Sequence, residues 1–147
     1  FADTPQPFLS RESQRWVMEK YSYNPKCVTE DWLDELMRVA SLPKYLESVD
    51  KMEKQGLSEK IFLPNHGREK ADTFDRLMDH GTNRPNLLIW GNNDPTATID
   101  QGFVLLDLLR HKEPRTEMHV FNESGHFTYR EHPEAFNRFL LDYVNGL

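Results

Sequence analysis

The chain has 147 residues and a formal net charge of −6, so it is about as long as one domain and it is acidic. The acidic balance argues against nucleic acid and against an anionic membrane as partners, because both repel negative charge. No apolar run reaches the roughly 20 residues of a membrane span, no signal-peptide pattern is present, and the single Cys27 can form no internal disulfide. We therefore expect a soluble, cytoplasmic protein.

The first half of the chain has the pattern of consecutive amphipathic helices without strands. Ser10 can cap a helix that runs to about Lys20, and Thr29 can cap a second helix. The apolar stripe of this second helix consists of Trp32, Leu33, Leu36, Met37 and Ala40. Pro43 suits the first turn of a third helix, which Gly56 should end. Three such helices predict a small helical cap.

The chain should leave this cap through an irregular segment, residues 57–70. Within this segment the run Pro64, Asn65, His66 and Gly67 is typical of a loop. A short helix over residues 71–80 should follow. We therefore divide the chain into a helical cap domain, residues 1–70, and a core segment, residues 71–147.

The core segment alternates strands with helices. Residues 87–90 and 118–121 are short, apolar, β-prone runs, and each is followed by a turn. Residues 99–110 between them are long enough for a crossover helix, so the two strands should be parallel neighbours joined by a right-handed crossover. A last helix should start near Pro133. These elements indicate the α/β class.

Two polar side chains follow the two strands at equivalent positions. Asp94 lies in the turn after the first strand, and His126 lies in the turn after the second. The carboxyl ends of parallel strands meet at one edge of a sheet, where open α/β sheets place their catalytic groups. A histidine there can exchange protons near neutral pH, and a neighbouring carboxylate can hold its ring. The pattern predicts that Asp94 and His126 form a catalytic pair.

The motifs around these residues resemble a known family. In chain order they are L-L-I-W-G-N-N-D, D-Q-G-F before a leucine-rich helix, H-V-F-N-E-S-G-H-F, and E-H-P-E-A-F-N-R-F-L. They resemble the C-terminal part of the α/β-hydrolase fold, and more specifically the meta-cleavage product hydrolases. Residues 28–43 resemble more weakly a helix of the family's cap. The resemblance implies that Asp94 and His126 are two members of a catalytic triad, with no cofactor and no metal.

The third member of such a triad is not found in this sequence. No serine of the chain lies in a G-x-S-x-G nucleophile motif, no H-G-type oxyanion loop is present, and the chain starts at Phe1. We therefore expect a C-terminal chain whose partner is a separate N-terminal chain of the same enzyme. That partner would carry the nucleophile, the oxyanion hole and most of the sheet. The resemblance also implies that the reconstituted enzyme can be a homodimer.

Several side chains are candidates for contact with a substrate. Phe127 directly follows the histidine, so the turn should hold it beside the chemistry. Trp16, Trp32 and Met37 could line a pocket under the cap, although stripes at this spacing more often form a cap core. The remaining histidines show no spacing typical of a metal site. His119 should be a sheet residue, and His132 should cap a helix or face solvent.

The resemblance implies a serine-type hydrolase that acts on a small, largely apolar carbonyl substrate. The resembled family cleaves carbon–carbon bonds of ring-fission dienoates, and two departures weaken that transfer. Leu36 stands where the family has an arginine for the substrate carboxylate, and Arg38 lies about 200° further around the helix. Phe127 stands where a tryptophan is usual. An ester, amide or thioester therefore remains an alternative substrate, and a non-hydrolytic cyclase, lyase or binding protein remains an alternative function.

Overall fold

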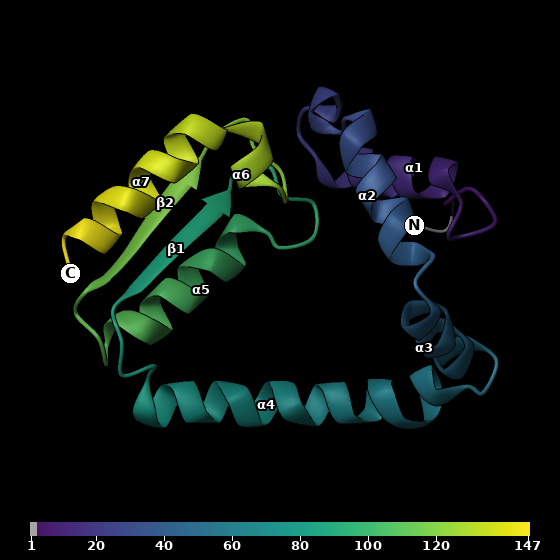
Figure 1. Ribbon diagram of the computed structural model, residues 1–147. Helices are drawn as coiled ribbons and strands as arrows, with labels where there is room; N and C mark the ends of the chain where they lie inside the picture. Colours follow the sequence, from purple (N-terminus) through teal and green to yellow (C-terminus); the bar gives the residue numbers. More distant parts are fainter. Residues whose placement is uncertain (1–2) are drawn as a thin grey trace.

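The computed structural model describes residues 3–147, so Phe1 and Ala2 lie outside it. The described residues form an open frame (Figure 1). On one side lie α1 (Arg11–Tyr21), α2 (Glu30–Ala40) and α3 (Pro43–Glu53). The long helix α4 (Leu63–His80) crosses to the other side, where the strands β1 (Asn86–Gly91) and β2 (Thr116–Phe121) lie. The helices α5 (Ile99–Arg110) and α7 (Pro133–Asn145) lie beside the strands. The short α6 (Thr128–Glu131) follows the turn after β2.

The three helices predicted for the first half of the chain are confirmed. The Ser10 hydroxyl accepts a hydrogen bond from the Ser13 amide at the start of α1 (3.1 Å). The Thr29 hydroxyl accepts from the Trp32 amide at the start of α2 (3.4 Å). Pro43 lies in the first turn of α3, where its missing amide proton leaves no carbonyl unpaired. Ser10, Thr29 and Pro43 therefore lie at the helix starts that the sequence predicts for them.

The prediction of an irregular segment over residues 57–70 is wrong. The π-helical turn η2 (Ser58–Phe62) leads directly into α4, which runs without a break through this stretch. Pro64 lies in the first turn of α4, and the Asn65 side chain accepts a hydrogen bond from Arg68 (2.9 Å). A proline followed by asparagine therefore starts the helix here. The boundary drawn between residues 70 and 71 falls inside α4, and the division into two domains stays a prediction.

Gly67 offers a direct check of this helix. A Cβ added at Gly67 meets no atom within 4 Å, and the residue is exposed on α4. We expect Gly67→Ala to raise the free energy of unfolding by about 0.5–1 kcal/mol, because alanine loses less backbone entropy in a helix. Urea denaturation of the intact protein measures this. The control Ala71→Gly, on the same helix, should have the opposite effect, and a destabilising Gly67→Ala would contradict a continuous α4.

The two strands pair in parallel, as predicted, with Asn86 opposite Thr116 and Gly91 opposite Phe121. Successive residues of a strand face opposite sides of a sheet. On one side α5 approaches closely, since a Cβ at Gly102 would lie 2.7 Å from the Met118 methyl. On the other side α7 contributes Phe139, whose ring stacks on His119 at 4.2 Å. A helix thus lies on each face of the sheet, and the prediction that His119 is a sheet residue is confirmed.

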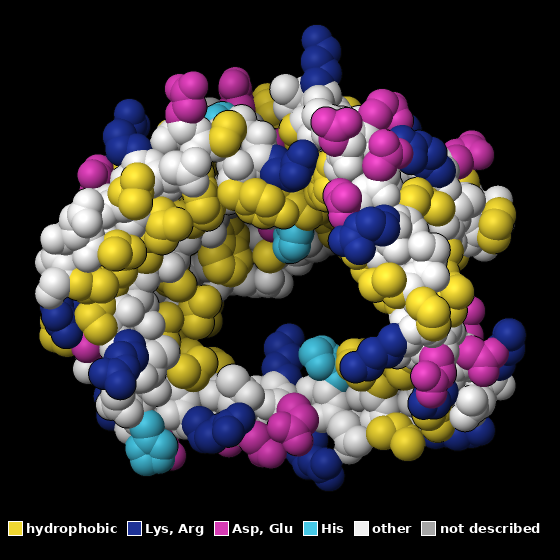
Figure 2. Space-filling model, in the orientation of Figure 1, with side chains coloured by type: hydrophobic (Ala, Val, Ile, Leu, Met, Phe, Trp, Pro, Cys, Tyr) yellow, Lys and Arg dark blue, Asp and Glu magenta, His cyan; other side chains and the backbone are white. Residues whose placement is uncertain are grey.

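The described part of the chain has little buried apolar surface. Its buried hydrophobic residues are Val28, Leu33, Ala40, Leu109 and Phe121. Large apolar side chains on α5 and α7 stay exposed, among them Val104 (60%) and Leu141 (59%). Figure 2 shows apolar side chains gathered over the half of the molecule that contains the sheet. Parallel sheets normally have more strands and buried faces, so this pair of strands has the surface of a partly uncovered sheet. None of the described helices is long and apolar enough to span a membrane.

Candidate active site

The turns that follow the two strands are bound to each other. The Asn92 amide donates to the Phe121 carbonyl (2.8 Å), and the Asn93 amide donates to the Ser124 carbonyl (2.8 Å). Gly91 lies so close to the second turn that an added Cβ would be 2.0 Å from the Gly125 carbonyl oxygen. Because the strands are parallel neighbours, both turns leave the sheet at the same edge. The side chains that follow are therefore brought together.

Asp94 and His126 are in direct contact at this edge. The Asp94 Oδ2 atom lies 2.7 Å from His126 Nδ1. The other carboxylate oxygen accepts hydrogen bonds from the Thr96 amide (2.8 Å), the Thr96 hydroxyl (2.9 Å) and the Ala97 amide (3.0 Å). The Asp94 side chain is 6% exposed, whereas that of His126 is 46% exposed. The carboxylate is thus fixed on one oxygen by the turn, and its second oxygen holds the imidazole.

The surroundings of Asp94 keep it ionised. Burial raises the pKa of this carboxyl group, but the hydrogen bonds from the Ala97 and Thr96 amides, from His126 and from the Thr96 hydroxyl together outweigh burial. The net result is a pKa below the usual value of an aspartate. An ionised Asp94 favours the tautomer in which His126 Nδ1 carries the proton, which leaves Nε2 free to accept one. This pair can therefore act as an oriented general base.

An aromatic cluster from both halves of the chain surrounds the histidine. The Tyr21 ring, at the end of α1, lies 5.4 Å from the His126 ring. The Phe127 ring contacts Trp32 of α2 at 4.8 Å in an edge-to-face arrangement. The Arg130 guanidinium also lies over the Trp32 ring, 4.2 Å from the ring centre. The helical cap therefore meets the core segment beside His126.

The candidate substrate-contacting residues are placed unequally. Trp32 and Phe127 touch each other next to His126. Trp16 lies on α1, with the Lys20 ammonium 5.5 Å from its ring centre, and Met37 is half-buried on α2. Contact of these side chains with a substrate stays a prediction. No cluster of potential metal ligands exists among residues 3–147.

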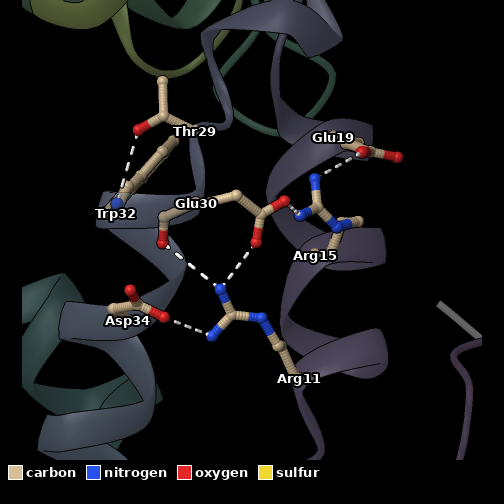
Figure 3. A network of polar contacts seen from close by, with 7 residues as sticks. All are labelled: Arg11, Arg15, Glu19, Thr29, Glu30, Trp32 and Asp34. Carbon is tan, nitrogen blue, oxygen red and sulfur yellow. Dashed lines mark hydrogen bonds and ion pairs between the residues drawn. The ribbon is translucent and has the colours of Figure 1, made fainter.

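An ionic network holds α2, and with it Trp32, against α1 (Figure 3). Arg11 pairs with Glu30 (2.6 Å) and with Asp34 (2.6 Å), and Arg15 also pairs with Glu30. Glu30 and then Asp34 raise the pKa of Arg11, and Arg11 is the main cause of a lowered pKa at Glu30. Each exposed pair contributes little by itself. Together they fix the side-by-side arrangement of the two helices.

Three contributors to the site lie outside the sequence-based prediction. Thr96 anchors the carboxylate, Tyr21 covers the imidazole, and the Glu131 carboxylate accepts a hydrogen bond from the Gly125 amide (2.6 Å). Thr96 could have been found, since a threonine two residues after an aspartate is a common turn partner. His132 lies at the N-cap position of α7, as predicted, without a side-chain capping hydrogen bond. Its ring stacks on Phe121 at 5.3 Å, with its Nε2 3.1 Å from the Glu123 carbonyl oxygen.

Comparison with known proteins finds a family model and hydrolase relatives that match this chain. The profile of the "Prolyl oligopeptidase family" matches residues 41–146. A 2-hydroxy-6-oxononadienedioate/2-hydroxy-6-oxononatrienedioate hydrolase of Pseudomonas putida is 37% identical over 82 residues, which are 56% of this chain and 27% of that protein. A 2-hydroxy-6-oxo-6-phenylhexa-2,4-dienoate hydrolase of Burkholderia cepacia is 26% identical over 140 residues, 93% of this chain and 43% of that protein.

Solved structures share the fold. A point mutant of the meta-cleavage product hydrolase CumD superposes with a TM-score of 0.69 at 20% identity, over 94% of this chain and 46% of that one. Cfl2 of Burkholderia cenocepacia superposes with a TM-score of 0.62 at 20% identity, over 97% and 44%. The chain therefore spans less than half the length of these relatives. The expected fold class, part of an α/β-hydrolase sheet with a helical cap, is confirmed.

Proposed function

Because the chain belongs to the prolyl oligopeptidase family and has part of the α/β-hydrolase fold, we propose that it supplies the acid and the histidine of a serine-type hydrolase. The observation that carries this proposal is the 2.7 Å contact between Asp94 and His126 at the ends of adjacent parallel strands. An imidazole held at Nδ1 by a carboxylate is the general base of this chemistry.

The two residues have distinct roles in the proposed mechanism. His126 Nε2 takes the proton of a serine hydroxyl while the serine oxygen attacks the substrate carbonyl. His126 then returns the proton to the leaving group, and a water molecule repeats the sequence to release the product. Asp94 holds the tautomer and stabilises the imidazolium while it exists. The half-exposed position of His126 leaves Nε2 accessible for these transfers.

The serine and the oxyanion hole come, in this proposal, from an N-terminal segment of the same enzyme outside this chain. Two observations support it. The relatives are more than twice as long as the matched region, and the described strands form a pair with exposed apolar side chains around it. A further segment that adds strands beside this pair would cover that surface. The homodimer of the complete enzyme likewise stays a prediction.

The proposed substrate is a small, largely apolar dienoate whose carbon–carbon bond is hydrolysed beside a carbonyl group. The names of the relatives support a dienoate. The second candidate, an ester, amide or thioester, is favoured by α2, where Leu36 is half-buried and Arg38 pairs with Glu35 (2.7 Å). Arg38 is thus directed along its own helix, in agreement with the expectation that it faces elsewhere.

An assay of the intact protein, meaning this chain together with the proposed N-terminal segment, decides between these substrate classes. A ring-fission dienoate and p-nitrophenyl esters of similar size are compared, and we expect kcat/KM for the dienoate to be at least about tenfold higher, the difference that 1.4 kcal/mol of transition-state binding produces. The reverse order would select the ester class. A fluorophosphonate probe serves as control for the mechanism, since it labels only an activated serine. No labelling, together with no turnover, would favour a cyclase, lyase or binding protein.

A further inference from the structure

Glu131 lies at the end of α6 and touches two parts of the chain that are far apart in sequence. Its Oε2 atom accepts a hydrogen bond from the Gly125 amide (2.6 Å) and faces the Ser124 hydroxyl at 3.3 Å. Its Oε1 atom accepts from the Asn24 amide (2.8 Å), 107 residues away in the loop after α1. The carboxylate therefore bridges the cap to the turn that carries His126.

The same turn is held by the cap from its other side. The His126 amide donates to the Tyr21 carbonyl (2.8 Å). A Cβ at Gly125 would lie 2.3 Å from that carbonyl oxygen and 2.7 Å from the Tyr23 amide nitrogen, so no side chain fits between the turn and the loop. Residues 124 and 125 are buried at this contact. The loop after α1 and the histidine turn are thus packed backbone against backbone.

A carboxylate suits this position for a chemical reason. The backbone amides of Asn24 and Gly125 both donate hydrogen bonds to it. An ionised carboxylate is a pure acceptor with two equivalent oxygens. Such charge-assisted hydrogen bonds are roughly twice as strong as neutral ones. An amide side chain of the same shape would accept from one backbone amide and present its own donor to the other. The bridge therefore needs glutamate itself rather than a polar residue of this size.

We propose that Glu131 is a positioning residue that couples the cap to the catalytic histidine: by joining Asn24 to Gly125 it sets the orientation of His126 toward Asp94. Loss of the bridge frees the histidine turn, and the His126 ring loses its alignment with Asp94 Oδ2. The effect on catalysis rests on the proposed function, whereas the effect on the ring does not.

The test is Glu131→Gln in the intact protein, with Glu134→Gln as the matched control. Glu134 is exposed in the first turn of α7, close in sequence but away from the bridge. We expect Glu131→Gln to lower kcat about 10- to 100-fold with little change in KM, since misplacement of a catalytic group by about 1 Å costs up to about 10²-fold. Long-range ¹H–¹⁵N NMR should show that His126 no longer has a single Nδ1–H tautomer. The control should match the wild type in both measurements.

The NMR readout separates this proposal from the proposed function. A changed His126 tautomer in a protein without hydrolase activity would support the positioning role and reject the hydrolase. An unchanged tautomer and unchanged kcat in folded Glu131→Gln would overturn the positioning role. If the variant does not fold, hydrogen exchange of the wild type decides: the Gly125 and Asn24 amides should both be strongly protected, and exchange of either at the rate of a free peptide would overturn the bridge.

Discussion

Asp94→Asn should lower kcat of the intact protein about 10³- to 10⁴-fold while the fold stays intact, by analogy with the serine-protease triad. The reason lies in the unequal partners of the two carboxylate oxygens. Three donors, from Thr96 and Ala97, converge on Oδ1, so the carbonyl oxygen of an asparagine must take that place. The asparagine NH₂ group then faces His126 Nδ1 and donates to it. The imidazole is forced into the Nε2–H tautomer, which cannot accept the serine proton.

Steady-state kinetics measures the loss, and NMR of the His126 ring nitrogens measures the tautomer. Asp100→Asn is the matched control, because Asp100 is exposed in the first turn of α5 and stands apart from the pair. Its kcat should equal that of the wild type. His126→Ala should lose at least as much activity as Asp94→Asn, since it removes the base itself. Near-full activity of Asp94→Asn would exclude the assignment of Asp94 as the triad acid.

The elements of this fold were predictable where a periodic apolar pattern and an end signal agree. The α2 start at Thr29 follows from such agreement, and α5 spans the predicted residues 99–110. The pattern of residues 57–70 is ambiguous, because proline and asparagine suit the first turn of a helix as well as a loop. The four-residue α6 is too short for a helical period to be visible. Local pattern therefore identified the elements with clear signals, and it missed the start of α4 and the whole of α6.

The candidate site also has parts that the sequence predicts and parts that it does not. The meeting of Asp94 and His126 follows from topology alone, because adjacent parallel strands end at one edge and each residue lies in the turn after its strand. The bridge through Glu131 depends on where the loop after α1 packs, and no local pattern encodes a contact across 107 residues. The contact between the two proposed catalytic groups was therefore predictable, while the groups that hold them were visible only in three dimensions.

Gly91→Ala should be the most damaging small substitution on the sheet side of the histidine turn. The added Cβ would lie 2.0 Å from the Gly125 carbonyl oxygen and 2.6 Å from that of Ser124, and both are backbone atoms of a buried turn. The turn must move away from β1, which carries His126 away from Asp94. We expect the free energy of unfolding to fall by about 1–3 kcal/mol or more, as for overpacked cores, and kcat to fall about 10²-fold.

Chemical denaturation and kinetics of the same variant measure the two effects, and Gly67→Ala supplies the comparison. Both substitutions add one methyl group and both reduce the entropy of the unfolded chain equally. Only Gly91 has backbone atoms where the methyl group must go, so the difference between the variants isolates the close contact. A Gly91→Ala protein with the wild-type denaturation midpoint and an intact Asp94–His126 hydrogen bond would mean that the turn can shift freely. In that case the close packing between β1 and the histidine turn would not be what aligns the catalytic pair.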